Sequence, residues 1–205
     1  MSQRKIESCT AFAGADRIAT GSIRDVALQA LAVVEGGDQR PVLVFDDANA
    51  HRIELDLRGP ADEMLQQLHW LVGEKQAAEP AEELPAKRRG PGRPKLGVVG
   101  REVTLLPRHW DWLGAQPGGA SVALRKLVEQ ARRANTGHDR VRKAQEATFR
   151  FMSALAGDEP GFEEATRALF AGDADRFATH AAMWPPDIQN YAARLAEAAF
   201  GSDLS

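Results

Sequence analysis

A stretch near the middle of this 205-residue chain cannot contribute to a hydrophobic core. Residues 75–97, KQAAEPAEELPAKRRGPGRPKLG, are rich in proline, glycine and charge and show no apolar periodicity. On either side of it, apolar residues recur at spacings that are typical of helices and strands. The sequence therefore predicts an α+β protein in four segments. These are an α+β module in 1–76, a flexible linker with a basic arm in 77–97, a strand and helical hairpin in 98–136, and a helical bundle in 137–205.

The first 76 residues carry the pattern of a small sheet and two helices. A hairpin is indicated around Gly14, and Ser22 can cap the helix that follows. The runs PVLVFDD and RIELDLRG predict two further strands, and Pro60 begins a second helix. Asp46 and Asp47, where the first of these strands ends, are the candidates here for a Mg²⁺ site. Consecutive strand residues point to opposite faces and turns are rich in Asp, so we expect no metal site.

The net charge of −3 conceals a strongly uneven distribution of charge. Residues 87–150 contain 15 Lys and Arg against 5 Asp and Glu, whereas residues 1–86 contain 8 against 15 and residues 151–205 contain 3 against 9. A basic stretch of this kind attracts polyanions whatever the average charge of the chain. The alternative is that the segments neutralise one another within the molecule.

The basic end of the linker has the composition of a DNA-binding arm. Gly92-Arg93-Pro94, with basic neighbours on both sides, resembles an AT-hook, although Pro91 stands where the usual hook has an arginine. Glycine lets the backbone approach the floor of a narrow minor groove, proline keeps the chain extended, and the arginine lies in the strong negative potential there. The alternative is a solvated linker.

Residues 101–133 have the element order of a known DNA-binding motif. A short alternating run at Val103–Leu105 is followed by a helix that Pro107 opens, a Pro-Gly-Gly break, and a second helix that Ser121 can cap. This order resembles the ribbon-helix-helix family of bacterial DNA-binding proteins. In that family two chains pair their strands into an antiparallel ribbon that enters the major groove, and the helices interlock in the dimer core. The resemblance implies an intersubunit core of Val103, Leu105, Trp110, Leu113, Leu124, Leu127 and Val128.

The same resemblance implies particular DNA contacts. Glu102 and Thr104 would face the groove, and the N–H groups around Ala120 and Ser121 would meet a phosphate. Direct readout should be weak, because Thr104 makes one modest contact and Glu102 accepts only from a cytosine amino group. With the arm included, the predicted DNA-contacting residues are Arg88, Arg89, Arg93, Lys95, Arg101, Glu102, Thr104, Ala120 and Ser121. The alternative is an ordinary helical hairpin preceded by an edge strand. The whole chain is also similar to an uncharacterised bacterial family that joins these same parts.

The sequence offers little for catalysis or cofactor binding. Residues 119–123, GASVA, are one residue away from a nucleophile elbow, but no strong strand precedes them. The five His residues lack metal-binding spacing, and there is no phosphate loop or dinucleotide fingerprint. The four amphipathic helices expected in residues 137–205 show no cofactor motif either. We therefore expect no enzyme and no cofactor.

The sequence also indicates where the protein acts. Cys9 is the single cysteine, which suits a reducing cytoplasm, and no apolar run is long enough for a signal peptide core or a membrane span. We expect a cytoplasmic, nucleoid-associated homodimer that binds duplex DNA, most simply as a transcriptional regulator. The alternative is a protein-interaction adaptor in which residues 98–136 only dimerise.

Overall fold

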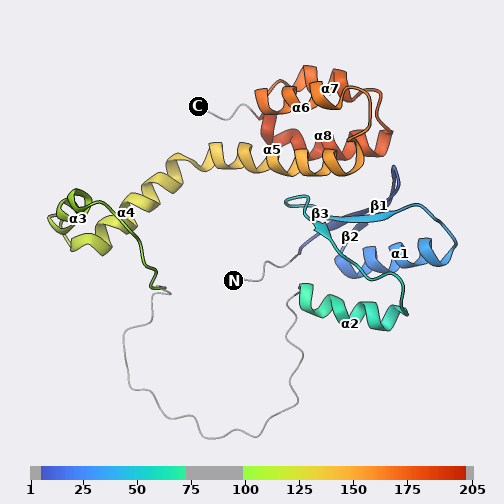
Figure 1. The fold of residues 1–205 in the computed structure, drawn as a ribbon, viewed down its shortest axis with the longest axis horizontal. Helices are drawn as coiled ribbons and strands as arrows, with labels where there is room; N and C mark the ends of the chain where they lie inside the picture. The colour runs from blue at the N-terminus through green and yellow to red at the C-terminus, as the bar shows by residue number, and fades with distance from the viewer. Residues whose placement is uncertain (1–5, 73–98, 202–205) are drawn as a thin grey trace, which may run out of the picture. The chain divides into compact units, whose positions relative to one another are not determined.

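The computed structural model describes residues 6–72 and 99–201, shown as a ribbon in Figure 1. Contacts within the chain define two compact units. Unit 1 combines residues 1–76 with residues 137–205, and unit 2 consists of residues 77–136. The fold is α+β, as the sequence predicts, with its antiparallel sheet near the N-terminus and its later part helical. In the parts of the chain that are described, no helix combines the length and apolar content needed to cross a bilayer.

Unit 1 is built around a four-stranded antiparallel sheet. Its strands are β1 (Cys9–Ala13), β2 (Asp16–Gly21), β3 (Val42–Asp46) and β4 (Arg52–Ile53), in the order β2-β1-β3-β4. The hairpin expected around Gly14 joins β1 to β2 and is confirmed. The strand expected over RIELDLRG is wrong beyond Ile53, because only two of its residues pair with β3. Leu55 and Leu57 nevertheless pack, partly buried, against the core.

One face of the sheet is covered by α1 (Ile23–Glu35) and α2 (Ala61–Val72). Ser22 caps α1, since its side chain accepts a hydrogen bond from the Asp25 backbone N–H at 3.3 Å, as predicted. The side chains on this face form one buried cluster, made of Cys9, Ala11, Ile23, Val26, Ala27, Leu31, Val44, Ile53, Met64 and Leu68.

The opposite face of the sheet packs against α5 (Thr136–Leu155) and α8 (Pro186–Phe200), from the C-terminal part of the chain. The helices α6 (Phe162–Ala171) and α7 (Ala174–Ala181) lie on the side of this pair that faces away from the sheet. Strand residues alternate between the faces, so Phe12 and Phe45 lie opposite Ala11 and Val44. Their rings meet Phe151 of α5 at 5.3 and 5.2 Å between centroids, and Tyr191 of α8 lies 5.3 Å from Phe12. This aromatic group is the centre of the larger core.

The ends of the last three helices follow their local sequence. Asp173 caps α7 by accepting a hydrogen bond from the Arg176 N–H at 3.0 Å. Pro186 occupies the first turn of α8, where its missing N–H is not needed. Gly161 precedes α6 with φ of 78°, and a Cβ there would lie 2.8 Å from the His180 carbonyl oxygen.

The first and last segments of the chain therefore share a core, although the sequence pattern divides them into a module and a bundle. The physical reason lies in β1, whose five residues are all buried. A strand that is covered on both faces needs a layer on each side, and residues 1–76 supply only one of the two layers.

Candidate nucleic-acid interface

The described part of unit 2 is a helical hairpin. It consists of α3 (Pro107–Gly114) and α4 (Gly119–Ala134), which pack against each other. Pro107 stands at the start of α3, and Leu106 before it is extended, with φ of −67° and ψ of 150°. Gly118 turns the chain into α4 with φ of 85°, a conformation that favours glycine. Both helices expected from the sequence are thus present, and the Pro-Gly-Gly break between them is confirmed.

The interpretation of Ser121 as the cap of the second helix is wrong. The N-cap of α4 is Gly118, so the helix begins at Gly119, and Ser121 lies inside its first turn with an exposed side chain. The left-handed backbone of Gly118 starts the helix without a side-chain cap. The first turn also contains no acidic residue, which leaves the positive end of the helix dipole without a neutralising carboxylate.

The other predicted DNA-contacting residues lie in two places. Arg101, Glu102 and Thr104 are exposed in residues 99–106, which form neither helix nor strand in the single chain. The strand expected at Val103–Leu105 is therefore absent within one protomer. A strand needs a hydrogen-bonded partner, which in the ribbon-helix-helix arrangement comes from a second chain. Arg88, Arg89, Arg93 and Lys95 lie outside the described residues.

Unit 2 exposes a large part of its apolar side chains. Among its described residues, only Leu113 and Ala123 have buried side chains, with exposed fractions of 3% and 8%. The exposed apolar side chains of residues 99–136 are Val99, Val103, Leu106, Trp110, Trp112, Leu127 and Val128. We call these seven residues the apolar surface. Isolated exposed apolar residues are ordinary, and seven of them are many for a hairpin of this size.

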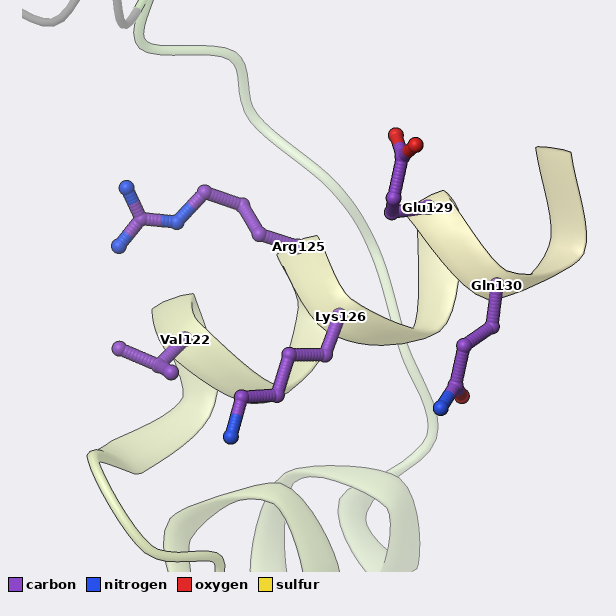
Figure 2. A pocket seen from close by; sticks show the side chains of 5 residues that line it. All are labelled: Val122, Arg125, Lys126, Glu129 and Gln130. Atoms are coloured by element: carbon purple, nitrogen blue, oxygen red, sulfur yellow. The ribbon is translucent and has the colours of Figure 1, made fainter. Parts of the chain in front are cut away.

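Charges on α4 are arranged unevenly around the helix. Glu129 accepts hydrogen bonds from Arg132 at 2.9 Å and from Arg133 at 3.0 Å, and these bonds lower the pKa of its carboxyl group. Arg125 and Lys126 take part in no ion pair within the described part of the chain. Together with Val122, Glu129 and Gln130, these two cations line an open groove along α4, shown in Figure 2. This groove was not expected from the sequence, where its signal is the pair of adjacent cations at Arg125 and Lys126.

The two aspartates considered for metal binding both have protein donors. Asp46 accepts hydrogen bonds from the Ala48 N–H at 2.9 Å and from the Asn49 side-chain amide at 2.7 Å. These bonds are typical of an aspartate that stabilises a turn. Asp47 is turned into the interior of unit 1. In residues 6–72 and 99–201, no group of three or more His, Cys, Asp or Glu side chains is arranged to hold a metal ion.

Asp47 holds the sheet to α8. It accepts hydrogen bonds from Thr10 Oγ1 at 2.8 Å, Tyr191 Oη at 2.7 Å and Arg194 Nη2 at 3.1 Å, and also from the Ser8 hydroxyl. Burial raises the pKa of the Asp47 carboxyl group, but the hydrogen bonds from Ser8, Tyr191 and Thr10 outweigh burial and hold the pKa below its ordinary value. This set of contacts joins residues far apart in the sequence, so no local pattern could have predicted it.

Comparison with known proteins supplies a family. The model of the DUF2239 family, described as an uncharacterized protein conserved in bacteria, matches residues 8–196. Neither a curated protein nor a solved structure matches the chain. The family match covers the sheet, both units and most of α8. The chain therefore belongs to DUF2239, a family of proteins conserved in bacteria.

Proposed function

We propose that the protein is a homodimer that binds duplex DNA, and that it acts as a bacterial transcriptional regulator. The observation that carries this proposal is the apolar surface of unit 2, which a single chain leaves exposed next to a strongly basic part of the sequence. In the proposed dimer, residues 103–105 of two chains pair as a ribbon, α3 and α4 of each chain pack against the other, and the basic arm contacts DNA.

The apolar surface supports a second copy as the partner. A hairpin with two buried core residues cannot stabilise itself through its own packing, because most helix stability in proteins comes from tertiary contacts. A second copy would cover Leu127 and Val128 of α4 and Trp110 of α3. It would also give residues 103–105 the strand partner that they lack within one protomer.

The charge distribution supports DNA as the ligand. Residues 87–150 carry 15 cations against 5 acids, and a dimer doubles that excess within one assembly. Glu102 and Thr104 offer little to the base edges, so the proposal expects phosphate contacts to supply most of the affinity. Binding of this kind is weakly sequence-specific and strongly salt-dependent.

The dimer is tested by changing a residue that is exposed in the single chain. Val128 is 63% exposed, so Val128→Asp should leave the fold of one protomer intact. In the dimer the same carboxylate would be buried without a partner, which costs several kcal/mol and weakens association by about 100-fold or more. Gln130→Asp, an exposed position on another side of α4, is the matched control and should remain dimeric. Light scattering on the three proteins measures the result, and a wild-type monomer at micromolar concentration would contradict the dimer.

DNA binding is tested through the arm. Replacing Arg88, Arg89, Arg93 and Lys95 together by Ala should weaken binding to all duplexes and reduce the salt dependence, since each lost phosphate contact removes about 0.9 from the slope of log K against log salt. Arg93→Ala alone should reduce any preference for A·T-rich duplexes. If wild-type protein shows no affinity for duplex DNA near 0.1 M salt, residues 98–136 only dimerise and the adaptor interpretation replaces this one.

A further inference from the structure

We infer that Arg125 and Lys126 form a second phosphate-binding surface, on the side of α4, that contacts the backbone of duplex DNA. The inference rests on the proposed function, and it concerns residues that neither the arm nor the expected ribbon includes. It predicts that DNA lies along α4 as well as against the arm.

The geometry of α4 brings the two cations to one groove. Long side chains in a helix point back toward its N-terminus, so adjacent residues 125 and 126 both lie over the turn that contains Val122. Figure 2 shows that the Lys126 and Gln130 side chains extend from one side of the helix, whereas Arg125 and Glu129 extend from its other parts, with Arg125 pointing back over the turn of Val122. The groove thus has a donor on each side, Lys126 with Gln130 on one and Arg125 on the other.

One hydrogen bond within the described chain holds the Arg125 guanidinium group and leaves its outer nitrogens for an external anion. Its Nε donates to the Ser121 carbonyl oxygen at 3.1 Å, which fixes the side chain along the helix. Neither terminal nitrogen of this guanidinium donates to a residue of the described chain, so both remain for a ligand. A guanidinium held in place in this way matches the paired oxygens of a phosphate.

The charge of the groove is positive although it contains an acid. The Glu129 carboxylate receives hydrogen bonds from both Arg132 and Arg133, which lie outside the groove, so its charge is already compensated. Arg125 and Lys126 have no such acidic partner among the residues that the structure describes. Their two positive charges are therefore directed to solvent, together with the side-chain amide of Gln130, which can donate as well.

Duplex DNA suits this surface better than a small anion does. The groove is open along the helix and is not an enclosed pocket, so it fits one part of an extended polyanion. Its two cations lie in the most basic third of the sequence, which also contains the arm. Phosphate contacts from helix side chains position a protein on a duplex without reading its sequence, which agrees with the weak base readout expected from Glu102 and Thr104.

The test compares two double variants with the same loss of charge. Arg125→Gln with Lys126→Gln removes two cations from the groove, and Arg167→Gln with Arg176→Gln removes two exposed cations from unit 1. Binding of the full-length proteins to one duplex is measured between 50 and 200 mM salt. The groove variant should lower the slope of log K against log salt by about 1.8, so that its disadvantage against wild type shrinks by about 12-fold across this range. The control should stay close to wild type.

The other outcomes contradict either the phosphate-binding role of the groove or the proposed function. If wild type binds DNA and the groove variant binds with the same affinity and slope, the groove is not a phosphate surface while the proposed function stands. If the groove variant and the control lose affinity equally, net charge explains the effect and the groove has no special role. If wild type binds no duplex at 50 mM salt, the proposed function and this inference fall together.

Discussion

The contact between Tyr191 and Asp47 gives the sharpest test of how unit 1 is held together. Tyr191→Phe removes one hydroxyl group and keeps the ring, so the packing against Phe12 and Phe151 is unchanged. The change therefore isolates a single hydrogen bond of 2.7 Å to a carboxylate whose side chain is 10% exposed. We expect the variant to fold and to be less stable than wild type.

The size of the loss follows from the charge of the acceptor. A hydrogen bond to a charged group contributes about 1.5–3 kcal/mol, against about 1 kcal/mol for a neutral pair. Thr20→Val is a suitable control, since it removes the neutral contact of 3.1 Å between the Thr20 and Thr10 hydroxyls, and Thr20 is exposed. We expect the free energy of unfolding to fall by about 2 kcal/mol in Tyr191→Phe and by under about 1 kcal/mol in Thr20→Val.

The measurement is urea unfolding at neutral pH, followed by circular dichroism, with a double-mutant cycle that adds Asp47→Asn. The two single changes should be strongly non-additive, because Tyr191→Phe removes the donor and Asp47→Asn removes the acceptor's charge in the same contact. A Tyr191→Phe protein within about 0.5 kcal/mol of wild type, or additive single changes, would refute the view that this bond stabilises the attachment of α8 to the sheet.

Three further predictions concern the same unit. Gly161→Ala should destabilise the fold by several kcal/mol more than Gly172→Ala. Both glycines have a positive φ (78° and 72°), but only at Gly161 would the added Cβ lie 2.8 Å from a backbone oxygen, the His180 carbonyl. Thermal unfolding of the two variants measures the difference. Cys9 is fully buried, and this burial, together with the nearby carboxylates of Asp47 and Asp46, raises the pKa of its thiol to about 12. A thiol reagent at pH 8 should therefore label the native protein far more slowly than the urea-unfolded protein, and equal rates would contradict the burial. Because the pKa of Asp47 is lower in the folded protein, its carboxylate stabilises the fold fully at pH values above the unfolded pKa of 3.8, and this stabilisation should disappear as the pH falls through the folded pKa. The free energy of unfolding of Asp47→Asn, measured between pH 5 and 2, should therefore depend less on pH than that of wild type.

Local elements could be predicted from the sequence because their signals are local. The Ser22 cap, the proline at the start of α3, the glycine break before α4 and the Asp173 cap each depend on one or two neighbouring residues. The error at Ser121 has the same origin, since a serine and a glycine three residues apart can both start a helix. The left-handed backbone of Gly118 decided between them.

The arrangement of these elements could not be predicted in the same way. Phe12 and Phe45 read as ordinary strand residues, and nothing near them indicates that Phe151 and Tyr191 cover them. The α4 groove was missed for a related reason, because it depends on Glu129 accepting hydrogen bonds from Arg132 and Arg133, while Arg125 donates to the Ser121 carbonyl oxygen instead. Contacts that depend on distant partners or on competition among neighbours leave no periodic signal.

The shared core of the first and last segments sets the order in which this protein can fold as it is made. Phe12 and Phe45 leave the ribosome long before Tyr191, which completes the aromatic group around them. At about 5–20 residues added per second, the sheet waits roughly 7–30 s for α8. During that time its aromatic face is open to other chains, and a nascent chain that stalls before residue 186 keeps it open. Production of the protein should therefore be sensitive to chaperones that bind exposed apolar segments, and the intervening unit 2 lengthens the delay by every residue that it contains.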